Sequence, residues 1–139
     1  MSLSTLLTRE PVTAAPMDSL VQVAALMERE KVGAVVITEG TRPVGIVTDR
    51  DLAMAVCVHG VTSRERVQNV MTCPVTTISK DEGVFNATQI MMDNAVRRLP
   101  VVDENGILVG LVAIDDLLLL LSREVQSMAE GIKAETAAV

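Results

Sequence analysis

The sequence is almost without aromatic residues: it has one Phe and neither Trp nor Tyr. A hydrophobic core must therefore be built from aliphatic side chains, which the hydrophobic fraction of 49% supplies in quantity. Basic residues are also few, with 12 Lys and Arg against 18 Asp and Glu, for a net charge of −6. Non-specific nucleic-acid binding needs basic grooves and stacking rings, so we expect no nucleic-acid partner.

Few residues are available for metal or disulfide chemistry. The chain has one His, His59, and two cysteines, with no CxxC pair. These residues cannot complete a usual zinc site, so we expect no metal. We expect Cys57 and Cys73 to be small buried hydrophobic residues in a reducing compartment.

Long apolar runs are absent as well. The longest, residues 111–121, is interrupted by Asp115 and Asp116 and is too short to span a bilayer. Residues 1–10 lack the features of a signal peptide, so we expect a cytoplasmic protein with no membrane partner. The sequence offers no Ser-His-Asp set, metal cluster or paired acid and base, so we expect no catalytic residues and no enzyme.

The first half of the chain has the pattern of a strand, a helix, two strands and a second helix. Apolar residues recur at helical spacing in one segment, and β-branched runs flank a turn-forming segment. In order, we predict an extended piece at 11–14, a helix from Asp18 or Ser19 to about Glu30, a hairpin of strands at 34–38 and 44–47, and a helix from Asp49 to about Val58.

The most informative stretch is residues 45–52, GIVTDRDL. Its apolar run suits a buried strand, and Thr48-x-x-Asp51 is typical of a helix N-terminus. Free N–H groups at a helix start attract phosphate, and a carboxylate can accept two sugar hydroxyls. Two interpretations stay open: a capping box that serves stability alone, or a hydroxyl and a carboxylate that bind a ligand.

The pattern returns 65 positions later at residues 110–117, GLVAIDDL. The preceding elements return with it, including an echo of residues 11–13 at 74–76. Each half is too small to bury its own sheet, so we expect an α/β (α+β) fold in which two β-α-β-β-α halves pack face to face. The predicted boundaries are 8–58 for the first repeat, 59–70 for a linker, 71–122 for the second repeat and 123–139 for a C-terminal helical extension.

The last helix is predicted to run beyond the second repeat. Its apolar residues share one face: Leu117, Leu121, Val125, Met128 and Ile132. This face either packs on the protein's own sheets or forms a self-association surface, and the sequence leaves both open.

Together these motifs resemble a cystathionine-beta-synthase (CBS) domain pair, also called a Bateman module. The resemblance rests on residues 45–52, 70–72 (VMT), 96–103 (VRRLPVVD) and 110–117, and covers nearly the whole chain. It implies two βαββα repeats about a pseudo-twofold axis, in a stand-alone module that dimerises into a flat disc. It also implies a sensor that binds AMP, ADP, ATP or S-adenosylmethionine between the repeats, has no obligatory cofactor, and acts on a partner protein.

The resemblance also implies a set of binding residues. Thr48 would contact ribose or phosphate and Asp51 the ribose, while the backbone at Gly33 would lie against the base. Arginines from the opposite repeat would reach the phosphates, since Arg makes fixed, multi-donor contacts to phosphate. The full set of expected ligand-binding residues is Gly33, Ala34, Ile46, Thr48, Arg50, Asp51, Thr72, Val75, Arg97, Arg98 and Asp116.

The second copy departs from this pattern. Ala113 stands where the first copy has Thr48, and Asp115 stands where it has Arg50, although Asp116 is kept. We therefore expect one competent site, centred on Thr48 and Asp51, and a weak or empty site in the second cleft. The missing hydroxyl and the acidic net charge also favour an alternative function: a ligand-free dimerisation scaffold that regulates a partner by contact.

Overall fold

The computed structural model describes residues 2–137 and contains two three-stranded sheets. The first repeat comprises β1 (Thr13–Ala14), α1 (Leu20–Glu30), β2 (Ala34–Glu39), β3 (Arg42–Thr48) and α2 (Asp49–Cys57). The second comprises β4 (Ile78–Ser79), α3 (Val84–Asp93), β5 (Arg98–Val102), β6 (Leu108–Ala113) and α4 (Ile114–Ala137). Two short 3-10 helices, η1 (Leu3–Leu6) and η2 (Val67–Asn69), precede the repeats. The predicted α/β fold of two βαββα repeats is confirmed.

Local sequence signals fix the ends of these elements. Ser19 caps α1: the Gln22 N–H donates to Ser19 Oγ at 3.2 Å, and the Ser19 N–H donates to Gln22 Oε1 at 2.8 Å. The two hairpins turn at Gly40 and Gly106, whose φ angles of 63° and 76° cost glycine little. In each sheet the short first strand pairs in parallel with the middle strand, and the hairpin is antiparallel. Both predicted hairpins are confirmed.

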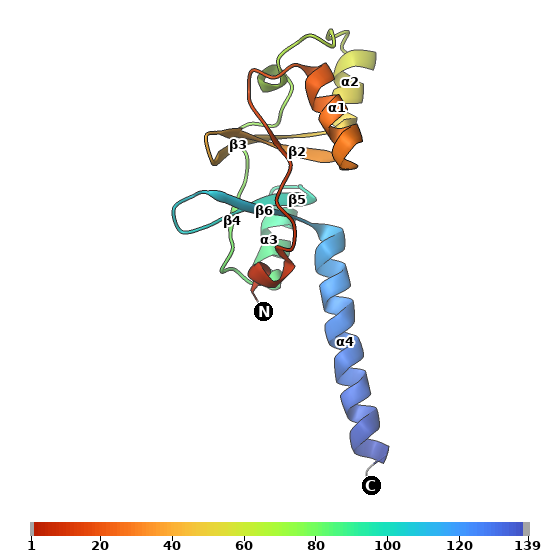
Figure 1. The fold of residues 1–139 in the computed structure, drawn as a ribbon. Helices are drawn as coiled ribbons and strands as arrows, with labels where there is room; N and C mark the ends of the chain where they lie inside the picture. Colours follow the sequence, from red (N-terminus) through yellow and green to blue (C-terminus); the bar gives the residue numbers. More distant parts are fainter. Residues whose placement is uncertain (1, 138–139) are drawn as a thin grey trace.

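Each repeat builds an aliphatic core between its sheet and its helices. Phe85, the single aromatic residue, is 79% exposed, so the predicted aliphatic core is confirmed. Val36 of β2 and Pro100 of β5 are fully buried yet belong to neither core. They lie on the sheet faces that point away from these two cores. The two sheets are neighbours in the middle of the molecule (Figure 1).

The segment that leads into each repeat packs on the other repeat. Leu3 lies in the core of the second repeat, and its N–H donates to Glu82 O at 2.9 Å. Val67 lies in the core of the first repeat, and its N–H donates to Asp18 O at 2.8 Å. In Figure 1 the N-terminal segment starts beside α3 and crosses both sheets before entering the first repeat. The two repeats are therefore interlocked.

A glycine in each third strand allows the crossing segment to approach closely. A Cβ at Gly45 of β3 would overlap the side chain of Met71, and a Cβ at Gly110 of β6 would overlap Leu7. The two pairs occupy equivalent places in the two repeats, because Met71 follows Leu7 by 64 positions and Gly110 follows Gly45 by 65. The crossing is thus built into both copies of the repeat.

The sequence echo at residues 74–76 does not mark the first strand of the second repeat. The strand of the second repeat is Ile78–Ser79, so the echo lies outside it. In the first repeat the Val36 N–H donates to Val12 O at 3.1 Å. Pro100 stands at the position of Val36 and has no N–H to make the equivalent bond, so pairing begins further along.

The expectation that the cysteines are buried is also wrong, because Cys57 and Cys73 are both exposed. Cys57 is the last residue of α2, where the chain turns toward solvent. Cys73 follows the point at which the second crossing segment leaves β3, just after the bridge between Ile46 and Thr72.

Helix α4 runs without interruption over 24 residues and leaves the body of the molecule, with the C-terminus at its far end (Figure 1). Leu117 is buried in the core of the second repeat, whereas residues 121–137 are exposed. The apolar face predicted for this helix is therefore divided: its first residue packs on the protein's own sheet and the remainder faces solvent. Among residues 2–137, no helix combines the length and the hydropathy needed to cross a membrane.

Candidate functional site

Thr48 and Asp51 form a capping box at the start of α2. The Asp51 N–H donates to Thr48 Oγ1 at 3.1 Å, and the Thr48 N–H donates to Asp51 Oδ2 at 2.9 Å. Both side chains are half-buried. The capping role weighed from the sequence is therefore present, and it engages Oδ2 of the carboxylate, so a ligand at this place would contact Oδ1.

The start of α4 repeats half of this arrangement. The Ala113 N–H donates to Asp116 Oδ2 at 2.9 Å, as in the first repeat, but Ala113 has no hydroxyl to return the bond. Asp116 is exposed, whereas its counterpart Asp51 is half-buried. The carboxylate of the second repeat is thus held in the same orientation and is more accessible.

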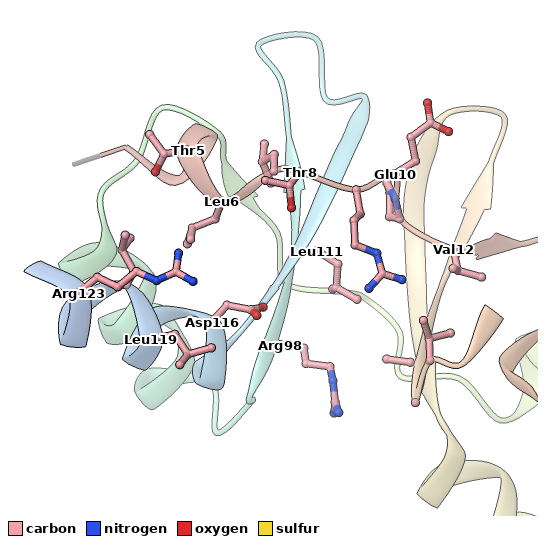
Figure 2. A pocket seen from close by; sticks show the side chains of 17 residues that line it. Thr5, Leu6, Thr8, Glu10, Val12, Arg98, Leu111, Asp116, Leu119 and Arg123 are labelled. Atoms are coloured by element: carbon pink, nitrogen blue, oxygen red, sulfur yellow. The ribbon is translucent and has the colours of Figure 1, made fainter.

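A cavity of about 460 Å³ opens beside Asp116, between the two repeats. Figure 2 shows Asp116 in the first turn of α4, Leu111 on β6 and Arg98 at the start of β5, with the N-terminal segment along one side. The volume lies within the range of small-molecule sites. The lining residues are Thr5, Leu6, Leu7, Thr8, Arg9, Glu10, Pro11, Val12, Val32, Gly33, Ala34, Arg98, Leu111, Asp116, Leu119, Leu120 and Arg123.

The charges around this cavity differ from those of the protein as a whole. Three arginines line it, Arg9, Arg98 and Arg123, against two carboxylates, Glu10 and Asp116. The chain carries a net charge of −6, so this is a local concentration of positive charge in an acidic protein. Guanidinium groups bind phosphate with several donors each, so the cavity has the chemistry to hold an anion.

Four of the sequence-predicted residues meet in this cavity: Gly33, Ala34, Arg98 and Asp116. Gly33 and Ala34 come from the first repeat and the other two from the second, so the site joins both repeats. Thr48 and Asp51 do not line this cavity. The structure therefore divides the predicted residues between this cavity and the equivalent helix start of the first repeat.

The other predicted residues do not line this cavity. Ile46 and Thr72 are paired by backbone hydrogen bonds of 2.9 and 3.2 Å, which bring the second crossing segment to the edge of β3. Arg97 lies 4.0 Å from Asp115 of its own repeat, and both side chains are exposed. The remaining two, Val75 and Arg50, are half-buried and exposed, respectively.

Sequence reasoning missed the part of the cavity that the N-terminal segment and α4 supply. Thr8 precedes the predicted cleft residue Thr72 by 64 positions, and Pro11 precedes Val75 by the same interval. Transferring the predicted site through the repeat would have found both. Arg9 and Arg123 have no basic counterpart in the other repeat, and no sequence signal marked them.

A family model settles which proteins this arrangement belongs to. The model of the CBS domain matches the chain twice, over residues 3–57 and 67–123. The chain belongs to the CBS domain family. The two matches include both crossing segments, in agreement with the interlocked packing of the two repeats.

Two curated relatives align with most of this chain. MK0525 of Methanopyrus kandleri is 36% identical over 127 residues, which cover 90% of this chain and 65% of that protein. The CBS domain-containing protein YhcV of Bacillus subtilis is 33% identical over 111 residues, or 80% of this chain and 79% of YhcV. The chain therefore spans just under two thirds of the first relative and about four fifths of the second.

Solved CBS structures with bound ligands have the same fold. The CBS domain protein PAE2072 from Pyrobaculum aerophilum, complexed with AMP, matches with a TM-score of 0.78 at 29% identity, covering 88% of this chain and 99% of that one. The CBS domain pair of protein MJ0100, in complex with 5′-methylthioadenosine and S-adenosyl-L-methionine, matches with a TM-score of 0.79 at 25% identity, covering 89% and 98%.

Proposed function

We propose that this protein is a non-enzymatic regulatory module that binds an adenosine-containing ligand between its two CBS repeats. The candidates are AMP, ADP, ATP and S-adenosylmethionine. The observation that carries the proposal is the cavity of about 460 Å³ in which residues of both repeats meet around Asp116. The AMP complex of PAE2072 and the adenosyl complex of MJ0100 support the class of ligand.

Each part of such a ligand has a complementary feature in the Asp116 cleft. The carboxylate of Asp116 can accept hydrogen bonds from a ribose diol through the oxygen that does not cap α4. Three arginines of the lining, Arg9, Arg98 and Arg123, supply donors for phosphate. The base has no ring to stack on, so it would lie between aliphatic side chains such as Val32 and Leu111.

The helix start at Thr48 and Asp51, which the sequence favoured as the competent site, is the second candidate for the ligand. It has the hydroxyl that the Asp116 cleft lacks, and Thr72 of the crossing segment lies at its edge through the bridge to Ile46. A ligand there would contact Thr48 and Asp51 in addition to their mutual cap. Arg50 and Arg97 are the arginines we assign to its phosphate contacts.

Binding of the ligand would act on a partner protein, and we propose that the module works as a homodimer. Exposed apolar side chains on α1, α3 and α4, among them Val21, Phe85 and Leu118, support an interface formed by helices. The alternative is a ligand-free scaffold with the same dimer. It is favoured by Ala113 in place of a threonine and by the acidic net charge.

A thermal melt with a panel of ligands separates sensor from scaffold. Wild-type protein is heated with AMP, ADP, ATP, S-adenosylmethionine or NADH. A ligand present at 100 times its dissociation constant adds about 2.7 kcal/mol to the free energy of unfolding. For a domain of this size, the melting temperature rises by about 5 to 12 °C. We expect this rise with at least one adenosyl ligand, and unchanged nucleotide after incubation, because we propose no turnover.

No rise with any ligand at millimolar concentration would reject the sensor and leave the scaffold. The protein must first be shown to carry no ligand from its host. The chain has neither Trp nor Tyr, so a bound adenine would dominate its near-ultraviolet absorbance. A spectrum before and after denaturation and filtration provides this control.

A further inference from the structure

The outer part of α4 is a helix without a partner in the monomer. Every residue from 121 to 137 is exposed, so this part extends about 25 Å from the second repeat at 1.5 Å per residue. An isolated helix of this length is only marginally stable in water, because tertiary packing supplies most of the stability of helices in proteins. The projecting helix therefore needs a surface to pack against.

Five exposed apolar residues of α4 follow a heptad, and the exposed Leu119 lies beside it. The intervals between them are 3, 4, 3 and 4 residues, which is the spacing of the a and d positions of a coiled coil. All are between 46% and 68% exposed. They are Leu118, Leu121, Val125, Met128 and Ile132, which we call the C-terminal seam.

We propose that the C-terminal seams of two copies of this protein pair as a parallel, in-register, two-stranded coiled coil. The identities at the seam favour this arrangement. Val125 and Ile132 are β-branched and occupy a positions, while Leu121 and Met128 are unbranched at Cβ and occupy d positions. β-branched residues at a with Leu at d favour parallel dimers.

The end of the seam also distinguishes the two directions. Glu135 occupies the next d position after Ile132. In an antiparallel pair that matches Val125 with Met128, Glu135 would lie against Leu118 of the other copy and put a carboxylate into an apolar layer. In the parallel pair the five apolar layers match one another, and the two exposed Glu135 carboxylates share the following d layer, where solvent screens their repulsion.

The flanks of the seam permit close approach. Residues at the e positions are small, namely Ser122, Ala129 and Thr136. At the g positions Glu124 is followed by Gly131. In a parallel pair g faces e of the next heptad, so Glu124 meets Ala129 of the other copy and no like charges face each other. At the e and g positions, a second copy of this helix therefore meets no like charge.

This inference rests on the proposed homodimer and adds its direction, independently of ligand binding. Because α4 begins in the second repeat, a parallel seam places the second repeats of the two copies next to each other and the first repeats at corresponding ends. The protein would then be a head-to-head dimer held together at its C-terminal end.

Disulfide trapping tests the direction. In the full chain, with Cys57→Ser and Cys73→Ser to remove both exposed thiols, Ile132→Cys is compared with Ala134→Cys, which lies on the opposite side of the same turn. In the parallel pair the two thiols introduced at position 132 share a layer, and the Cα atoms that carry them are close enough for a disulfide. In the antiparallel pair position 132 faces position 121, so the two introduced thiols are about 16 Å apart and cannot be linked.

At micromolar protein concentration, we expect mild oxidation to convert most of the Ile132→Cys protein into a covalent dimer. We expect it to convert little of the Ala134→Cys control. Equal linking of both variants, or no linking of Ile132→Cys, would overturn the inference. Light scattering on the reduced proteins separates the proposal of a homodimer from the proposal of a parallel seam. A dimer that does not link at position 132 rejects the parallel seam alone, whereas a monomer rejects the homodimer as well. Neither result bears on the ligand.

Discussion

At the scale of single residues, the two repeats differ most at the start of their last helix. Thr48 gives a hydroxyl to the cap of α2, and Ala113 gives none to α4. The carboxylates that follow, Asp51 and Asp116, accept the same backbone hydrogen bond at the same distance of 2.9 Å. Comparing the two helix starts therefore separates the contribution of the capping hydroxyl to stability from the contribution of the carboxylate.

The first prediction concerns this cap. Thr48→Ala removes one of the two reciprocal bonds and should lower the free energy of unfolding by about 0.5 to 2 kcal/mol. The reverse change in the second repeat, Ala113→Thr, supplies a hydroxyl and should raise it by up to about 1 kcal/mol. Urea denaturation of both variants measures the change. Loss of stability in both would show that the two helix starts are not equivalent.

The sequence predicted the chemistry of the site better than its location. The carboxylates and Arg98 were found because the motif repeats and the residue types suit ribose and phosphate. The open cavity could not be located, because it depends on a crossing: Leu3, Leu6 and Leu7 pack on the core of the second repeat, although they precede the first. Arg123 joins the cavity only because α4 continues past the repeat.

At the scale of elements, the crossing segments depend on two glycines. Met71 lies where a Cβ of Gly45 would be, and Leu7 lies where a Cβ of Gly110 would be. Met71 has three rotatable side-chain bonds and can move aside more easily than the branched Leu7. The two crossings should thus differ in how well they tolerate an added methyl group.

The second prediction compares these glycines. Gly110→Ala should lower the free energy of unfolding by about 1 to 3 kcal/mol through overpacking, and Gly45→Ala by a smaller amount. Gly131→Ala in α4 serves as the control, since its Cβ meets open space and it replaces a poor helix former. It should raise helical stability by roughly 0.5 to 1 kcal/mol. The account of the crossings fails if Gly110→Ala is neutral.

Most elements were predictable because their patterns are strong and local. Helix α1 has a capping residue and regular apolar spacing, and β2 is a β-branched run, so both were placed within a residue or two. The strand β4 was misplaced, because its position depends on a distant residue: Pro100 cannot donate the bond that Val36 makes. The exposure of Cys57 depends on where a helix ends, which composition does not reveal.

At the scale of the whole molecule, the exchanged segments tie the two repeats together. Leu3 belongs to the core of the second repeat and Val67 to that of the first. Neither repeat can therefore unfold without disturbing the core of the other. The two halves should behave as one cooperative unit despite their separate cores.

The third prediction follows from this coupling. Wild type should unfold in one thermal transition, with equal calorimetric and van't Hoff enthalpies. Leu3→Ala removes a fully buried side chain and should lower the free energy of unfolding by about 2 to 5 kcal/mol while keeping a single transition. Two separate transitions in either protein, observed by calorimetry, would contradict the interlocked account.

The measurement that tests the central claim most directly is a calorimetric titration of AMP into wild type, Asp116→Asn and Asp51→Asn. The amide oxygen of asparagine can accept the backbone hydrogen bond from Thr48 or Ala113 that the carboxylate accepts, so both variants should fold. With its amide oxygen on the backbone N–H, each new side chain presents an NH₂ group that cannot accept a bond from ribose. We predict that Asp116→Asn weakens binding at least tenfold and that Asp51→Asn leaves it within twofold. Unchanged binding by Asp116→Asn, or a loss confined to Asp51→Asn, would contradict a ligand site in the Asp116 cleft.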